Sequence, residues 1–258
     1  MGLALLDGWL DQGTPASSIA VVEPAEANAA QVRVRGVLTV ADLSPLGRSM
    51  APEVIVLAVK PQVIDTILPL YAPLARRGAA VLSIAAGKTT SSLNRGLGGD
   101  AAIVRAMPNT PASIRQGISV ACATPPVSAV QRQRCNDLLA CVGSVLWVED
   151  ESLMDAVTAV SGSGPAYVFL LTECLARAGE EVGLPGETAA QLARETVAGA
   201  GALLARSPLA VEVLRANVTS PGGTTAAALS ILMAEGGLQP ILTRAVAAAT
   251  KRAGKLAG

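Results

Sequence analysis

Residues 218 to 225, VTSPGGTT, gather small and hydroxylated residues that can bind a small anion. Gly222 and Gly223 follow a Ser-Pro pair, and two threonines lead into an apolar run with helical periodicity that starts at Ala226. Glycine lets the backbone turn its N–H groups toward one point, and the N-terminus of a helix adds partial positive charge there. The stretch is compatible with a carboxylate site, but an ordinary capped loop between two helices is the commoner meaning of so short a motif.

The residue types that are absent narrow the chemistry. The 258-residue chain has no histidine, which excludes Ser-His-Asp and Cys-His catalysis and removes the commonest zinc ligand. Its four cysteines form no Cys-x-x-Cys pair, so we expect no metal site. They are typical of small buried residues in a reducing compartment.

Charge and hydropathy limit the classes of partner that the protein is expected to bind. Lysine plus arginine equal aspartate plus glutamate at 20 each, so nothing favours binding to nucleic acid or to an anionic membrane surface. No apolar run reaches the roughly 18 residues of a membrane span, and the N-terminus lacks the basic region of a signal peptide. We therefore expect a cytoplasmic protein, and a hydrophobic content of 51% predicts a substantial core.

The first part of the chain alternates apolar runs with helical segments. Runs typical of buried strands cover residues 18–24, 54–59, 79–84, 102–106 and 144–148, and an alternating stretch at 31–36 predicts another short strand. Helical spacing covers 1–11 and 127–141. Strands separated by helices favour a parallel sheet with helices on both faces, which binds ligands at the carboxyl ends of its strands.

Small residues and prolines follow these strand ends. The stretches are Glu23-Pro24, Val59-Lys60-Pro61, Ala85-Ala86-Gly87 and Met107-Pro108-Asn109. Such residues suit a backbone that lies close to a flat cofactor, and they suit ordinary turns between strands and helices equally well.

The second part of the chain, from about residue 149, has helical periodicity alone. It is rich in alanine, glycine and other small residues, and its last two helices are apolar around much of their girth. We expect a separate all-helical domain that buries this surface against a second subunit. Packing onto the first domain is the alternative.

Five segments carry a resemblance to a known family. They are AVKPQ at 58–62, AAGK at 85–88, MPNTP at 107–111, DAVTAVSGSGPAYVF at 155–169 and VTSPGGTT at 218–225. With these segments, in this order over nearly the whole chain, the sequence resembles the pyrroline-5-carboxylate reductase family.

The resemblance implies an α/β Rossmann-like parallel sheet followed by an all-α C-terminal domain. It implies a dinucleotide-binding domain over residues 1–148 and a helical dimerisation and substrate domain over 149–258. The expected reaction is the reduction of 1-pyrroline-5-carboxylate to L-proline by NADPH or NADH, the last step of proline biosynthesis. The expected assembly is a homodimer or a higher oligomer.

The resemblance also implies site residues. Thr225 is the expected catalytic residue, with its hydroxyl near the ring nitrogen of the substrate. The expected substrate-binding residues are Glu151, Asn217, Ser220, Gly222, Gly223, Thr224 and Thr225. The expected cofactor-binding residues are Gly2, Glu23, Pro24, Ala58, Val59, Lys60, Pro61, Ile84, Ala85, Ala86 and Asn109, with Gly87 beside them.

Glu23 bears on the choice of cofactor. An acid at this strand end accepts hydrogen bonds from a ribose 2′-hydroxyl and repels a 2′-phosphate, which favours NADH. Arg33 or Arg35 could offset that preference.

The chain departs from the family at its beginning. The family opens with a strand and a Gly-x-Gly-x-Met-Gly turn, and Met1-Gly2 corresponds to the end of that turn. The missing strand is normally central, so we expect a gap flanked by unpaired strand edges. A start at an internal methionine of a longer protein and a real truncation both explain this, and we favour the first. For the chain as it stands we expect weak or absent activity.

Two other functions compete. A related two-domain hydroxy-acid dehydrogenase would need a general acid such as lysine or histidine in the helical domain, which residues 218–225 do not supply. A cofactor-free dimeric scaffold is the other alternative, and it depends on the missing first strand and glycines.

Overall fold

The computed structural model describes residues 1–46 and 50–257. Contacts divide the chain into two compact units, one of Met1–Gly162 with Thr250–Gly258 and one of Ser163–Ala249. The last turns of the final helix therefore belong with the first unit. The sequence predicts a boundary after residue 148, between a dinucleotide-binding domain and a dimerisation and substrate domain. That boundary stays a prediction.

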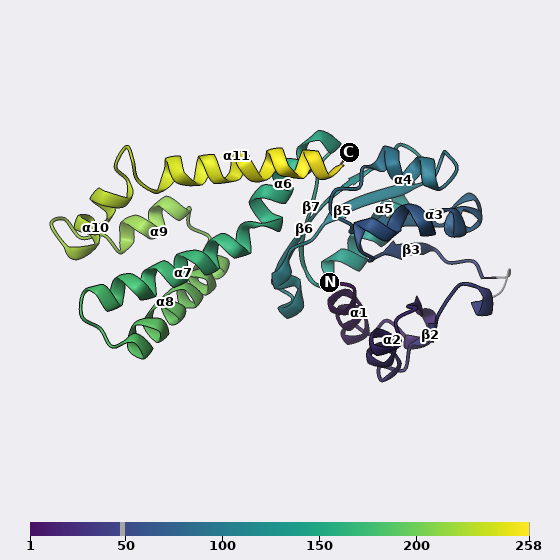
Figure 1. Cartoon of the computed structure of the whole chain (residues 1–258), viewed down its shortest axis with the longest axis horizontal. Helices are drawn as coiled ribbons and strands as arrows, with labels where there is room; N and C mark the ends of the chain where they lie inside the picture. The colour runs from purple at the N-terminus through teal and green to yellow at the C-terminus, as the bar shows by residue number, and fades with distance from the viewer. Residues whose placement is uncertain (47–49, 258) are drawn as a thin grey trace. The chain divides into compact units, whose positions relative to one another are not determined.

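The strands lie in the first unit (Figure 1). They are β1 (Ala20–Val22), β2 (Leu38–Val40), β3 (Val54–Leu57), β4 (Ala80–Ser83), β5 (Ile103–Met107), β6 (Gly117–Ala123) and β7 (Gly143–Trp147). One sheet has the order β3-β4-β5-β6-β7, and a second contains β1 and β2. A sheet alternating with helices confirms the predicted fold class.

Strand β6 corrects the expectation of an entirely parallel sheet. It was not predicted, and it runs antiparallel to β5 while the other pairs are parallel. Only residues 108–116, with the short helix η3 (Thr110–Ile114), connect β5 to β6. A parallel crossover needs a dozen or more residues, so this connection returns the chain in the opposite direction.

The strand predicted at 31–36 is wrong. These residues include the end of helix α2 (Glu26–Arg33), and strand β2 follows at Leu38–Val40. Val34 is exposed, whereas Ala29 and Val32 share the buried face of the helix. Spacing of three residues along a helix explains that shared face, and alternation over so few residues was a weak signal.

Helices pack on both faces of the larger sheet. They are α1 (Gly2–Asp11), α3 (Pro61–Arg76), α4 (Thr90–Gly96) and α5 (Ala129–Ala140), and the short helices η4 (Glu151–Leu153) and α6 (Met154–Val157) follow β7. Leu82 of β4 packs in one core cluster with Leu5 and Leu139, and its neighbour Val81 packs in another with Ile64. Successive side chains of a strand point to opposite faces, so β4 is buried on both.

A cavity of about 1030 Å³ separates the two sheets. Residues along the whole of β1 and β3 line it, together with Met1, Leu5 and Trp9 of the first helix region. In the described part of the chain β1 pairs with β2 alone and β3 with β4 alone. Each strand therefore leaves one backbone edge without a neighbouring strand on the side of this cavity.

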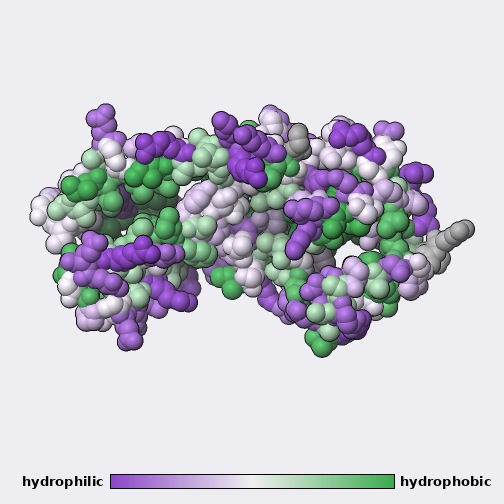
Figure 2. Space-filling view, viewed as in Figure 1, coloured by the Kyte–Doolittle hydropathy of each residue, from purple (hydrophilic) through white to green (hydrophobic). Residues whose placement is uncertain are grey.

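The second unit consists of helices. They are α7 (Gly164–Glu181), α8 (Gly186–Arg206), α9 (Val211–Asn217), α10 (Thr224–Leu232) and most of α11 (Leu238–Ala257). Helices α7 and α8 approach closely, since a Cβ added at Gly179 would lie 3.2 Å from the Cβ of Ala189. Large apolar side chains such as Phe169 and Leu170 remain exposed on α7, and hydrophobic atoms are visible at the surface in Figure 2.

None of the helices among residues 1–46 and 50–257 is both long enough and apolar enough to cross a membrane.

Candidate active site

The carboxyl ends of β3 and β4 carry predicted cofactor residues of the first unit. Strand β3 ends at Leu57 and α3 begins at Pro61, whose fixed backbone suits the first turn of a helix. The backbone N–H of Ile84 donates to the carbonyl of Leu57 at 3.1 Å, which joins the two strand ends. The predicted cofactor residues at 58–61 and 84–86 therefore follow neighbouring strands at one edge of the sheet.

Gly2 lies against this edge. A Cβ added to Gly2 would stand 3.2 Å from the Cβ of Ala58, so the start of α1 approaches the end of β3 closely. No side chain caps this helix at Met1, and the first amides of an uncapped helix favour an anion. The structure thus brings together Gly2 and Ala58, two predicted cofactor residues that are far apart in the sequence.

The turn after β4 is shaped by its small residues. Gly87 has φ 71°, a left-handed conformation that favours glycine, and Ala85 donates its N–H to the hydroxyl of Ser83 at 3.4 Å. Thr89 then caps α4, because its hydroxyl accepts a hydrogen bond from the N–H of Ser92 at 3.1 Å. The predicted nicotinamide segment is therefore a tight turn that leads directly into a capped helix.

Asn109 and Glu23 both make local structural contacts. The side-chain oxygen of Asn109 accepts from the N–H of Ile118 at 3.0 Å, which fixes the start of β6. Glu23 follows β1, and its carboxylate accepts from the N–H of Ala25 at 2.9 Å across Pro24. Each side chain keeps further hydrogen-bonding capacity, so these contacts leave the predicted cofactor roles open.

The two arginines that could offset Glu23 are paired elsewhere. Arg33 binds Glu26 at 2.5 Å, and the Nη2 of Arg35 donates to Asp7 at 2.9 Å. The hydrogen bond from Arg35 lowers the pKa of the Asp7 carboxyl against the opposing effect of burial. Both arginines thus already pair with a carboxylate of this chain, and neither is an unpaired cation that could bind a 2′-phosphate.

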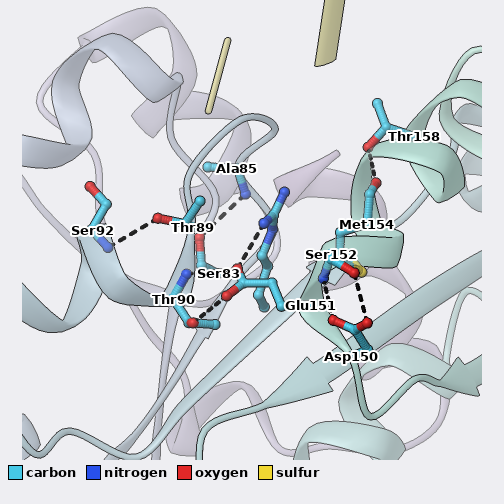
Figure 3. A network of polar contacts seen from close by, with 11 residues as sticks. Ser83, Ala85, Thr89, Thr90, Ser92, Asp150, Glu151, Ser152, Met154 and Thr158 are labelled. Carbon is cyan, nitrogen blue, oxygen red and sulfur yellow. Dashed lines mark hydrogen bonds and ion pairs between the residues drawn. The ribbon is translucent and has the colours of Figure 1, made fainter. Parts of the chain in front are cut away.

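Glu151 accepts three hydrogen bonds from two residues of the first unit. Its Oε1 accepts from the backbone N–H of Thr90 at 2.8 Å and from Nη1 of Arg105 at 2.7 Å. Its Oε2 accepts from the hydroxyl of Thr90, and Figure 3 shows Thr90 and Glu151 facing one another. The sequence predicted Glu151 as a substrate-binding residue but predicted neither of its partners, Thr90 and Arg105. The signal for Arg105 was a single charge inside the apolar strand IVRAM.

The surroundings of Glu151 favour its ionised form. Burial raises the pKa of this carboxyl, but the hydrogen bonds from Thr90 and Arg105 outweigh burial and leave the pKa below its usual value. Glu151 is therefore a carboxylate near neutral pH.

Residues 218–225 form a turn at the start of a helix. Helix α9 ends at Asn217 and Gly223 is the N-cap of α10, with its N–H bonded to the carbonyl of Ser220 at 3.0 Å. Gly222 has φ 70° and nothing lies within 4 Å of an added Cβ, so backbone conformation alone requires glycine there. Thr224 and Thr225 occupy the first turn of α10, where the N-cap offers no side-chain hydrogen bond.

The amides of that first turn have the orientation that binds anions at helix N-termini. The structure thus places the predicted substrate residues Ser220 to Thr225 together on one turn, with Asn217 just before it. Within the described ranges, no group of three or more histidine, cysteine, aspartate or glutamate residues is placed to hold a metal ion.

Comparisons with known proteins cover the whole chain. The family model described as pyrroline-5-carboxylate reductase dimerisation matches residues 151–256. The pyrroline-5-carboxylate reductase of Pseudomonas aeruginosa is 40% identical over 257 residues, which cover 100% of this chain and 93% of the relative.

Solved structures agree. A pyrroline-5-carboxylate reductase from Coxiella burnetii superposes with a TM-score of 0.93 at 35% identity, over 100% of this chain and 95% of the other. A Plasmodium falciparum pyrroline carboxylate reductase with NADP bound gives a TM-score of 0.81 at 28% identity, with the same coverage. With identity of this level along its full length, the chain belongs to the pyrroline-5-carboxylate reductase family.

Proposed function

We propose that this chain reduces 1-pyrroline-5-carboxylate to L-proline with NADPH or NADH, the last step of proline biosynthesis. The observation that carries the proposal is the 40% identity to a pyrroline-5-carboxylate reductase, which runs through both the strand-end edge and the turn at 218–225. Neither a hydroxy-acid dehydrogenase nor a cofactor-free scaffold is favoured by an observation of comparable weight.

The strand-end edge fits a nicotinamide nucleotide. Ala58, Ala86 and Gly87 are small, which would leave room for a flat ring beside the backbone, and the first amides of α1 suit a phosphate. Gly2, Glu23, Pro24, Ala58, Val59, Lys60, Pro61, Ile84, Ala85, Ala86 and Asn109 are the residues proposed to hold the cofactor. When bound, the nicotinamide supplies the hydride.

The turn at 218–225 fits the substrate carboxylate. The amides at Gly222, Gly223 and Thr224, together with the hydroxyl of Ser220, would bind the carboxylate, and Asn217 and Glu151 would contact the rest of the ring. The hydroxyl of Thr225 would hydrogen-bond the imine nitrogen and keep it aligned as it becomes an amine. This assignment needs no histidine, and the chain contains none.

The exposed apolar helices support assembly. The matching family model is one of dimerisation, and Phe169 and Leu170 expose large apolar surfaces on α7. We propose a homodimer or a higher oligomer of this chain that acts in the cytoplasm, with no nucleic acid or membrane partner.

Proline formation is the direct test. The purified chain is mixed with 1-pyrroline-5-carboxylate and either nucleotide, and proline is measured by mass spectrometry while nucleotide oxidation is followed by absorbance. Proline formed in step with nucleotide oxidation supports the proposal. Oxidation of a hydroxy acid in place of imine reduction would support the dehydrogenase, and absence of nucleotide binding would support the scaffold. The gap between β1 and β3 leads us to expect slow turnover.

A further inference from the structure

The carboxylate of Glu151 joins three elements that are far apart in the sequence. Glu151 lies in η4, Arg105 lies in the middle of β5, and Thr90 is the first residue of α4. The two hydrogen bonds to Thr90 span 61 positions of the chain, and the ion pair with Arg105 spans 46. The short helix that follows β7 is thereby tied to the helix that follows β4.

The guanidinium of Arg105 is buried and pairs with Glu151. Its side chain is only 6% exposed in the ion pair, and its cross-strand neighbours in the sheet are Ser83 and Cys122. Burying a guanidinium costs free energy unless a partner compensates, and Glu151 is the carboxylate that does so. The arginine in turn keeps Glu151 ionised, and an ionised carboxylate is the stronger acceptor for both groups of Thr90.

Thr90 is the point where this pair acts on the turn after β4. The turn from Ile84 to Lys88 is held at its beginning by β4 and at its end by the start of α4. Ala85 is bonded to Ser83, and Lys88 pairs with Asp65 at 2.6 Å at the surface. The hydrogen bonds from Thr90 to Glu151 fix the end of the turn against the body of the unit.

We propose that Arg105 and Glu151 form a positioning pair that holds the 84–90 turn through Thr90 and thereby sets the affinity for the nicotinamide nucleotide. Its consequence for the nucleotide rests on the proposed function. Oε2 of Glu151 accepts one hydrogen bond and has a further acceptor position, so the role is compatible with a contact to substrate as well.

The decisive measurement is hydrogen exchange of the full chain, followed by mass spectrometry of peptides that cover residues 84–93. Thr90→Val keeps the shape and leaves the ion pair intact. Glu151→Gln removes the charge, and the double variant Arg105→Met/Glu151→Gln leaves no buried charge behind. Glu149→Gln is the matched control, because Glu149 is an exposed carboxylate two positions away that pairs with Arg132 at 3.0 Å.

We expect exchange in 84–93 to accelerate by about tenfold in Thr90→Val and more in the double variant, as befits loss of hydrogen bonds to a charged group. Exchange elsewhere stays as in wild type, and Glu149→Gln leaves 84–93 unchanged. Unchanged exchange in 84–93 for Thr90→Val and the double variant would overturn the proposal. So would a uniform acceleration across the whole unit, because that means general destabilisation.

Nucleotide kinetics separate positioning from structure. In Thr90→Val we expect KM for the nucleotide to rise by about tenfold while KM for 1-pyrroline-5-carboxylate stays within twofold, since Arg105 and the backbone N–H at position 90 still hold Glu151 in place. Accelerated exchange with an unchanged nucleotide KM overturns the role in affinity. A wild-type chain that binds neither nucleotide overturns the proposed function instead, and exchange then still decides whether the pair holds the turn.

Discussion

The carbonyl oxygen of Leu256, near the end of α11, lies so close to Gly87 that a Cβ added there would stand 2.9 Å from it. Gly87 also has φ 71°. The last turn of α11 therefore packs on the turn predicted to line the nicotinamide, within one compact unit.

Gly87→Ala should destabilise the first unit more than backbone conformation alone explains. The left-handed conformation costs an alanine about 1–2 kcal/mol, and overpacking against Leu256 adds about 1–3 kcal/mol. Gly36→Ala is the matched control, because Gly36 has φ 74° and nothing lies within 4 Å of an added Cβ. Urea unfolding compares the free energies, and equal losses in the two variants would contradict the close contact.

The ion pair of Glu151 should make stability depend on acid. The folded-state pKa of Glu151 lies below the 4.5 of an unperturbed glutamate, so the stabilisation is complete above that value and is lost as pH falls through the folded pKa. Unfolding by urea between pH 7 and pH 3 should show a steeper loss in wild type than in Glu151→Gln. Parallel curves for the two proteins would mean that the carboxylate is not held by Arg105 and Thr90.

The hydroxyl of Thr225 should matter to turnover and not to folding. Thr225→Val should lower kcat by about 100-fold, the lower end of the range for a positioned proton donor or acceptor, whereas Thr225→Ser should retain most of the activity. Thr172→Val is the control in the same unit, since Thr172 donates its hydroxyl to the carbonyl of Val168 within α7. Steady-state kinetics at saturating nucleotide give the comparison, and equal rates for Thr225→Val and wild type would remove Thr225 from the catalytic role.

Local patterns predicted the elements that local patterns determine. Helix α1 followed from the spacing of Leu6 and Leu10, and β4 followed from its apolar run. Strand β6 was not predicted, because its residues, GISVACA, are mostly small. It forms a strand through its pairing with β5 and β7. Its antiparallel direction depends on the length of the preceding connection.

The candidate site likewise has features that were predictable from local sequence and features that were not. The turn at Gly222 was predictable because a left-handed conformation needs glycine and the following helix is visible in the sequence. The partners of Glu151 were not, because Arg105 and Thr90 meet it only after the sheet has assembled. A charge inside an apolar strand signals a buried partner and does not say which one.

The cavity between β1 and β3 should accept another strand. Both strands line it along their whole length, and Met1 lies at its wall. A strand occupies about 4.8 Å between neighbours, about 10 Å between packed faces and about 3.3 Å per residue along its axis. A cavity of about 1030 Å³ is therefore large enough for several residues of an extended strand.

Fusion of six apolar, β-branched residues and a glycine-containing turn ahead of Met1 should raise the melting temperature by several degrees. New hydrogen bonds to both edges and burial of the apolar lining supply the stabilisation, and each kcal/mol is worth about 2–4 °C in a domain of 150–250 residues. A fused segment of glycine and serine of equal length is the control. Equal melting temperatures for the two fusions would show that the cavity does not take a strand.

The exposed face of α7 should be buried between subunits. Phe169 is 62% exposed and Leu170 is 56% exposed, and apolar side chains of this size are costly to leave in water. Phe169→Lys/Leu170→Lys should shift the protein from dimer or larger toward monomer in sedimentation velocity. The dissociation constant of the assembly should rise at least tenfold. Val34→Lys is the control, because Val34 is an exposed apolar side chain of the first unit. Wild-type protein that sediments as a monomer at micromolar concentration, or a double variant that assembles as wild type does, would contradict burial of this face.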